Sequence, residues 1–506
     1  MTQGVYPPHP WLQVQEVAFV PRASSPLTDW VMEGLARTYR ALGHRVVDRP
    51  RPEHTTIVVT SAPYGEDVYW KEALLFNLRR LYGMRRVANF WTVVTVSPRR
   101  FREDLARIQQ ALADGVEGLS RLQFAGLAPS AAPALWEQGR RGGPIAVLER
   151  VVQTQAKSIR VLLVVGDEQP QEAYVFDLVG AYPRIPFRNE ADFLQEIVLR
   201  MVTVASTRTV SQHQMQGEPI PRQLWEALTA PRAMMQASRA FAQRDFFSPM
   251  VRIADFTHVP GALIISAMIA EQYSEGCFAT WEPQLDALVA TVTGSARPVH
   301  KGSLEEKDLA VIVGVRPDGM GAYYRPVEGL PNDPPSSEAV ELYGMDEKLP
   351  RISWQGHEVP VTRSKLHGHR GVAAYDPKRV EFVPLEEVYH HYPVTCASEA
   401  QALAVKAAFQ RAACLRNPED PRTLAFTIIP CHGVIIVEKW VPGKEPFQEI
   451  WEAMDQGALE MSLAVPQGPF GYRPGPDGRM HYTEDPAFWP WRREASASET
   501  VGSAVS

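Results

Sequence analysis

The first half of the chain alternates short apolar runs with amphipathic helical segments, and this order restricts the folds available to it. Each apolar run has the length of a strand and is rich in Val, Ile or Thr. The runs are residues 17–20, 44–47, 55–61, 88–96 and 159–166, and the helical segments are 28–43, 70–81 and 190–206. Strands that alternate with helices in this way form parallel sheets with right-handed crossovers. We therefore expect a Rossmann-like α/β domain in residues 1–145 and a second α/β segment with connecting helices in residues 146–250.

This half carries none of the common nucleotide-binding motifs. Neither a Gly-x-Gly-x-x-Gly turn after a strand nor a Walker-type loop is present. The turn at residues 60–65 follows an expected strand, at the end of the sheet where open α/β folds place ligands. Its residues specify no chemistry, so a plain surface loop is the simpler interpretation.

Composition excludes several classes of protein. The chain has 506 residues, enough for about three domains. Its net charge of −6 gives no basic surface for nucleic acid, and no apolar run reaches the roughly 18–20 residues of a transmembrane helix. The four cysteines lie in no paired motif and the N-terminus does not have the form of a signal peptide. We expect a cytoplasmic globular protein that acts on a small molecule.

Three histidines and one glutamate have the composition of a metal site. His367 and His369 form a His-Gly-His triplet at the end of an alternating run, where side chains two residues apart point to the same face of a strand. His432 lies in a second strand-like run, and Glu338 ends the polar turn Pro-Ser-Ser-Glu. Three neutral imidazoles with one open position are typical of catalytic zinc. Because the chain has 13 histidines, separate surface or core roles are the alternative for each of them.

From Ser274 to Val437 the chain resembles the class II aldolase/adducin family. The resemblance rests on a series of short motifs that occur in the order found in that family. They are Ser274-Glu-Gly-Cys-Phe-Ala-Thr-Trp, Val289-Ala-Thr-Val-Thr-Gly-Ser, Lys301-Gly-Ser-Leu-Glu-Glu-Lys-Asp-Leu, Pro335-Ser-Ser-Glu, His367-Gly-His and His432-Gly. The resemblance covers about a third of the chain and implies a class II aldolase-like α/β/α metal domain, which we place in residues 251–465.

The resemblance also implies a chemistry. The three histidines would hold a divalent metal, with zinc expected and manganese as the alternative, and Glu338 would act as acid and base beside it. The metal would polarise the oxygens of a ketose so that an enediolate can form and a carbon–carbon bond can break or form. Glycine and serine turns would bind a substrate phosphate. The residues implied in substrate binding are Gly276, Thr293, Gly294, Ser336 and Ser337.

Two departures from the family pattern bear on the substrate. Cys277 stands where the family has an asparagine, which removes an amide contact to phosphate. The segment between Glu338 and His367 is longer than usual and shows no clear helix. Binding of a phosphate and the identity of the substrate therefore stay open.

The expected function is a metal-dependent lyase of the aldolase type acting on a sugar, a sugar phosphate or a hydroxy-carbonyl compound. The alternatives are a sugar isomerase or epimerase of the fucose/arabinose isomerase type and a non-catalytic, adducin-like binding protein. Keeping all three histidines favours an enzyme, since a scaffold has no need of them. The Pro/Gly-rich and aromatic tail at 466–506 is expected to be partly disordered. Together with the apolar run at 259–270, its Trp489 and Trp491 predict a homo-oligomer.

Overall fold

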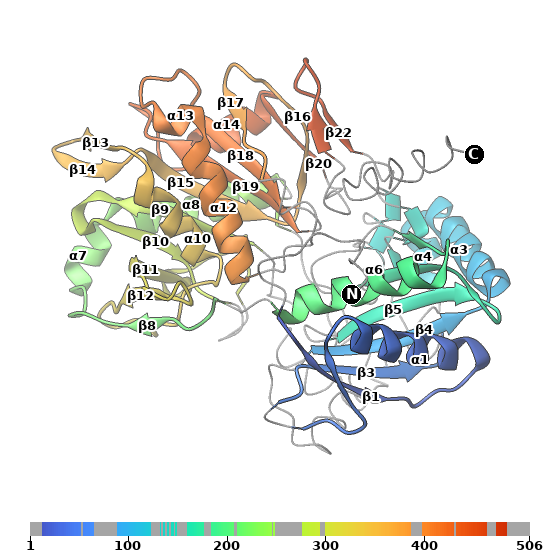
Figure 1. Cartoon of the computed structure of the whole chain (residues 1–506). Helices are drawn as coiled ribbons and strands as arrows, with labels where there is room; N and C mark the ends of the chain where they lie inside the picture. The colour runs from blue at the N-terminus through green and yellow to red at the C-terminus, as the bar shows by residue number, and fades with distance from the viewer. Residues whose placement is uncertain are drawn as a thin grey trace, which may run out of the picture.

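The structure is a computed structural model in which two large sheets carry most of the strands. It describes residues 13–51, 54–64, 89–122, 159–176, 184–206, 210–244, 246–247, 276–293, 299–385, 397–429, 432–462 and 472–482, with isolated residues between 132 and 148. Helices accompany both sheets, which Figure 1 shows in two separate parts of the molecule. The expectation of a mixed α/β protein is confirmed.

The first sheet has seven strands in the order β2-β1-β3-β4-β5-β6-β7. The strands are β1 (Glu16–Val20), β2 (Arg45–Val47), β3 (Ile57–Ala62), β4 (Asn89–Val96), β5 (Ile159–Gly166), β6 (Pro170–Phe176) and β7 (Ile185–Pro186). Strands β1 to β5 are parallel, as expected, whereas β6 and β7 add an antiparallel edge. The apolar strand β5 pairs along most of β4, so the sheet extends well beyond residue 145.

Two helices beside the first sheet form where the sequence predicts them, α1 (Pro26–Ala41) and α6 (Glu190–Ser206). Two others, α3 (Pro98–Ala113) and α4 (Gly115–Arg121), were not expected. The Ser25 hydroxyl accepts the backbone N–H of Thr28 at the start of α1, and Pro26 occupies a position in the first turn that needs no N–H donor. Apolar residues of α1 and α6 join β1 and β3 in one core. The helix expected at 70–81 lies outside the described residues.

The second sheet has nine strands in the order β17-β18-β19-β15-β9-β10-β11-β12-β8. They are β8 (Gln214–Met215), β9 (Cys277–Glu282), β10 (Ala287–Thr291), β11 (Leu309–Val315), β12 (Ala322–Arg325), β15 (Thr362–Gly368), β17 (Val380–Phe382), β18 (Leu424–Ile429) and β19 (Gly433–Lys439). Its central pairs, from β18 to β12, are antiparallel. Three two-stranded sheets accompany it: β13 (Arg351–Trp354) with β14 (His357–Pro360), β16 (Gly371–Tyr375) with β20 (Leu459–Ser462), and β21 (Tyr472–Pro474) with β22 (Met480–Tyr482).

Helices cover both faces of the second sheet. Alternate residues of each strand enter different cores: Phe278 and Leu366 belong to one, Cys277 and Ile435 to the other. The first core is completed by α8 (Thr229–Gln243) and α14 (Gln448–Asp455), the second by α10 (Ala339–Gly344) and α12 (Glu399–Arg411). The face under α10 and α12 is the one that carries the candidate site.

The segment expected as a separate unit at 146–250 is divided between the two sheets. Its β5, β6, β7 and α6 belong to the first sheet, while β8 and α8 pack with the second. Short helix α7 (Arg222–Ala227) also joins the second, through Trp225. Of the tail, residues 472–482 form the β21–β22 hairpin; the apolar run at 259–270 and the tryptophans 489 and 491 lie outside the described residues. No helix in the described ranges is both long enough and apolar enough to cross a bilayer.

Candidate metal centre

The antiparallel pairing of β15 and β19 brings the three histidines together. His367 lies near the end of β15, with Ile435 of β19 and Cys277 of β9 as its cross-strand neighbours. His369 follows the end of β15, and His432 immediately precedes the start of β19. Because the strands run in opposite directions, the end of one lies beside the start of the other. His432, expected inside a strand, therefore lies in the β18–β19 turn, and residues far apart in sequence meet at one edge.

Two glycines allow this close approach. A Cβ atom on Gly433 would lie 2.1 Å from the carbonyl oxygen of Gly368, a distance that no side chain tolerates. A Cβ atom on Gly368 would lie 2.3 Å from the ring of Phe246, which packs beneath the strand end. The glycine beside each histidine thus lets the two backbones and the aromatic core come together.

The three imidazoles lie close enough together to bind one metal ion. Ring centroids lie 4.7 Å apart for His367–His432 and for His369–His432, and 5.4 Å apart for His367–His369. One nitrogen from each ring can be chosen so that all three lie within 4.8 Å of one another. The Nε2 atoms of His369 and His432 are 3.1 Å apart. Two Zn–N bonds of about 2.0–2.1 Å at a tetrahedral angle would separate their nitrogens by about 3.3–3.4 Å.

Hydrogen bonding and burial favour the neutral, metal-binding form of the rings. His367 Nδ1 lies 3.0 Å from the carbonyl oxygen of Val434, so it carries the proton and leaves the Nε2 lone pair for a ligand bond. Burial, and then the neighbouring histidines, hold the pKa of His432 well below its ordinary value. His432 is fully buried and its Nδ1 has no hydrogen-bond partner within the described ranges. His369 is the half-exposed member, so the approach from solvent lies on its side.

Glu338 lies outside the group of ligand atoms. It is the residue before α10, and its carboxylate accepts the hydroxyl of Ser336 at 2.5 Å. The potential metal ligands that the structure brings together, among the residues it describes, are the three histidines without Glu338. The charge of Glu338 acts on Cys277, the cross-strand neighbour of His367. Glu338 therefore lies near the three histidines but is not one of the potential metal ligands.

The segment after Glu338 departs from expectation. It was expected to show no clear helix, yet it forms α10 and then the 3-10 helix η7 (Met345–Lys348). Both are too short for an apolar period to stand out in the sequence. Asp346 of η7 pairs with Lys365 of β15, an ion pair whose side chains are 7% and 0% exposed. This buried ion pair links η7 to β15, the strand that carries His367.

The residues expected to bind substrate lie around the end of β10. The backbone N–H of Thr293 donates to the Pro334 carbonyl, and the N–H of Ser336 donates to the Thr291 carbonyl, both at 2.9 Å. Gly276 precedes β9 with a φ of 108°, and a Cβ there would lie 2.8 Å from the His367 carbonyl oxygen. Ser337 is half-buried beside Ser336. Gly294 lies outside the described residues.

Cys277 connects this turn to the histidines. Its thiol accepts the Thr291 hydroxyl at 3.4 Å and is buried, which raises the pKa of the thiol to about 12. A protonated, buried thiol offers no amide for a phosphate. A buried, neutral thiol therefore lies beside His367 in this turn.

Three polar residues near Glu338 have surroundings that the sequence did not predict: His213 is half-buried, where a solvated connection was expected, and Glu341 and Gln401 are buried. His213 accepts the N–H of Ala322 through Nδ1 at 3.1 Å, and burial lowers its pKa to about 4. Glu341 is enclosed with Gln401 of α12, whose amide donates to both of its carboxyl oxygens. The one signal available was the spacing of Glu338 and Glu341, which places both on one side of a helix.

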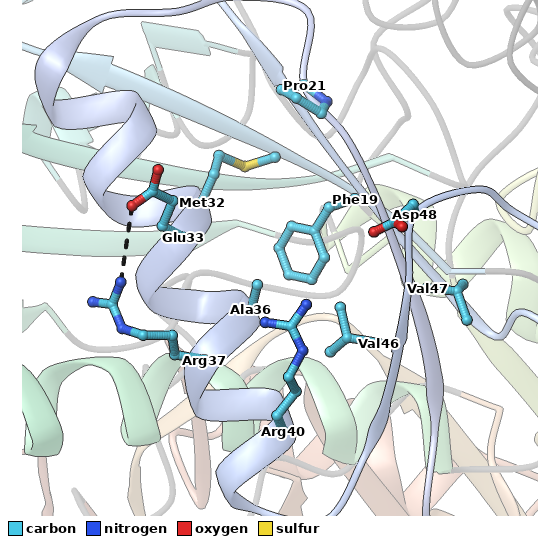
Figure 2. Close-up of a pocket in the computed structure, with 10 residues that line it drawn as sticks. All are labelled: Phe19, Pro21, Met32, Glu33, Ala36, Arg37, Arg40, Val46, Val47 and Asp48. Carbon is cyan, nitrogen blue, oxygen red and sulfur yellow. Dashed lines mark ion pairs between the residues drawn. The ribbon is translucent and has the colours of Figure 1, made fainter.

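A separate groove lies on the first sheet, between α1 and the ends of β1 and β2. Its volume is about 390 Å³. Figure 2 shows apolar side chains and four charged ones around it, with Arg37 paired to Glu33. The lining residues are Phe19, Pro21, Met32, Glu33, Ala36, Arg37, Arg40, Val46, Val47 and Asp48. The groove is open to solvent and involves neither the histidines nor the turn at 60–65.

Comparison with family models, with curated proteins and with solved structures found no match to this chain.

Proposed function

We propose that the second sheet holds one divalent metal ion on His367, His369 and His432, and that the protein is a metal-dependent lyase of the aldolase type. Zinc is the preferred ion and manganese the alternative. The observation that carries the proposal is the convergence of three imidazoles from two strand ends on one point. Such a set, with one or more positions left open, is typical of catalytic rather than structural metal sites.

The surroundings of the histidines support a catalytic use. The carbonyl of Val434 orients His367, and the buried position of His432 keeps its ring neutral. When bound, the metal would polarise a carbonyl or hydroxyl group and lower the energy of the oxyanion that develops next to the reacting carbon. Glu338, hydrogen-bonded to Ser336, would move a proton to or from that carbon.

The arrangement of the strands also supports the resemblance to class II aldolases. Apart from Pro335-Ser-Ser-Glu, which immediately precedes α10, the motifs that carry it lie on or next to neighbouring strands of one sheet, in the order β19-β15-β9-β10-β11. Helices cover both faces of this sheet, in keeping with the α/β/α domain that the resemblance implies. In the first half, the parallel order β2-β1-β3-β4-β5 supports the proposal of a doubly wound α/β sheet there. The substrate we propose is a sugar, a sugar phosphate or another hydroxy-carbonyl compound.

Exchange of carbon-bound hydrogen with solvent tests the proposal. The metal-loaded protein would be incubated in D₂O with a panel of ketoses, ketose phosphates and hydroxy-carbonyl acids, and followed by NMR. We expect deuterium next to a carbonyl of at least one substrate, together with cleavage into two carbonyl fragments. Exchange with rearrangement but without cleavage would point to the isomerase or epimerase. Binding of a ligand with neither reaction would point to the adducin-like binding protein.

Two variants distinguish the loss of metal binding from the loss of proton transfer. Glu338→Gln should keep the metal and lose the exchange, whereas His367→Ala should lose both. Glu347→Gln, an exposed glutamate in η7, is the matched control and should keep both. Full exchange in Glu338→Gln would remove Glu338 from the mechanism.

A further inference from the structure

Glu341 is a buried carboxyl group that has no cationic partner among the described residues. It is 2% exposed, and no Lys, Arg or His lies within ion-pair distance among the residues that the structure describes. Its partner is Gln401 of α12, which is 0% exposed and donates from Nε2 to the two carboxyl oxygens at 2.8 and 3.0 Å. An isolated carboxylate is costly in such surroundings, so the protonated acid is favoured.

Glu341 lies next to Glu338 on the same helix turn. Glu338 has helical backbone angles, φ −64° and ψ −16°, so the two residues have the i,i+3 relationship of a continuous helix. In that relationship Cβ atoms lie about 5–6 Å apart, within reach of direct or water-mediated proton exchange. Glu338 is half-exposed, whereas Glu341 is enclosed. The two carboxyl groups therefore have opposite environments.

The electrostatic surroundings of α10 also favour the protonated form of Glu341. Burial, and then the charge of Glu338, raise the pKa of Glu341 well above its ordinary value. From the neighbouring elements, His213 and Cys277 are held in their neutral forms. The charged groups are already paired: Asp346 of η7 with Lys365, and Glu347 with Lys406 of α12.

The Gln401 amide can accommodate either protonation state of Glu341. In the orientation observed, its NH₂ group faces both carboxyl oxygens, which suits the carboxylate, and its Oε1 is buried without a hydrogen-bond partner in the described part of the chain. Rotating the amide by half a turn would bring Oε1 to the carboxyl group, where it would accept the O–H of the acid. A buried polar atom without a hydrogen-bond partner is costly. The rotated orientation, in which Oε1 accepts a hydrogen bond from the protonated Glu341, explains why this atom is kept here.

We propose that Glu341 is a proton reservoir for Glu338, with Gln401 as the amide that adapts to its protonation state. The proposal builds on the acid/base role proposed for Glu338. When Glu338 has given its proton to substrate, the O–H bond of Glu341 breaks and the proton passes to the Glu338 carboxylate, directly or through one water. Glu341 is then the carboxylate, held by the Gln401 NH₂ group. The reverse transfer restores the starting state when Glu338 has taken a proton from substrate.

A carboxyl titration of the full-length protein tests the reservoir without any substrate. The side-chain carboxyl carbons of glutamate would be labelled with ¹³C, and the Glu341 signal assigned by its loss in Glu341→Gln. We expect its midpoint to lie well above the ordinary glutamate range. In Glu338→Gln, which removes the neighbouring charge, the midpoint should fall by roughly one pH unit. Glu347→Gln, the matched control on η7, should leave it in place.

A Glu341 midpoint in the ordinary range, or one that is the same in Glu338→Gln, would overturn the proposal. Glu341→Gln is nearly isosteric, and unchanged thermal unfolding would show that it folds. If that variant does not fold, Glu341→Asp makes the assignment instead, because it also removes the labelled glutamate carboxyl carbon at this position. Metal content is measured on the same samples. A protein without metal but with a raised, Glu338-dependent midpoint would refute the lyase and leave the coupled pair intact.

Discussion

The Nε2 atoms of His369 and His432 face each other at 3.1 Å across the ends of two antiparallel strands. Two neutral rings can share one hydrogen bond there, and the third imidazole, from His367, lies against the pair with a ring-centroid distance of 4.7 Å to His432. Among the described residues, Nδ1 of His432 has no hydrogen-bond partner. A metal cation bound by one nitrogen lone pair from each ring would stabilise this close approach of three neutral imidazoles. The metal would then stabilise the fold as well as carry chemistry.

Replacing a cluster histidine should remove the metal. We expect about one zinc ion per chain in the wild type and little in His367→Ala, His369→Ala or His432→Ala, measured by elemental analysis after dialysis. His357→Ala changes an exposed histidine of β14 and should keep the metal. Metal present at 100 times its dissociation constant would add about 2.7 kcal/mol to the free energy of unfolding. Chelation should therefore lower the melting temperature of the wild type and of His357→Ala, and leave that of the three cluster variants unchanged.

Gly433→Ala should disrupt the site through its backbone. Its new Cβ atom would meet the Gly368 carbonyl oxygen at 2.1 Å, which forces β15 and β19 apart beside His432. We expect a loss of more than about 2 kcal/mol in stability by urea unfolding, together with weaker metal binding. Gly344→Ala is the control, because its Cβ would meet nothing closer than 3.7 Å within a helix. Equal zinc affinity in Gly433→Ala would show that the close approach is not needed.

Lys365→Met should be more damaging than removal of the whole ion pair. It leaves the carboxylate of Asp346 buried without its cation, which costs about 3–5 kcal/mol. The double variant Lys365→Met with Asp346→Leu should recover most of this stability, because two apolar side chains replace two buried charges. Chemical unfolding of the three proteins tests it. A double variant as unstable as the single one would contradict the argument.

Stability should fall as the pH rises through the titration of Glu438. Burial raises the pKa of this carboxyl to about 7 from 4.5, in spite of the hydrogen bonds from Ser364 and from the backbone N–H of Phe447. The folded state then binds more protons than the unfolded state between these values, and unfolding becomes easier as they are lost, by at most about 3 kcal/mol. Glu438→Gln should flatten the slope between pH 4.5 and 7, and Glu358→Gln, on the exposed β14 strand, should not. An unchanged slope in Glu438→Gln would assign it to other groups.

The chain should assemble into a homo-oligomer with the histidine cluster near a subunit boundary. The reason lies in the apolar run 259–270 and in Trp489 and Trp491, which would otherwise expose hydrophobic surface. Light scattering at micromolar concentrations is the measurement. A mass equal to the 56.5 kDa of one chain would contradict this expectation.

Local patterns in the sequence were sufficient to predict much of the first sheet. Runs such as 55–61 and 159–166 are apolar throughout, and the period of helix α1 is plain because it is long and capped at Ser25. The same holds for the three histidines, since their residue type and spacing are visible without any contact. These features depend on a few neighbouring residues, and the sequence determines them.

The tertiary structure decided which of these pieces meet. Strand β5 pairs with β4, and β6 and β7 join the same sheet in antiparallel orientation. The boundary expected at residue 145 therefore lies within one sheet. The same kind of long-range pairing set His432 in the turn beside β15 and left Glu338 outside the ligand group. It also buried Glu341 against Gln401, 60 residues away in the chain. Proximity across strands and helices depends on burial summed over the whole core, and no local period in the sequence encodes it.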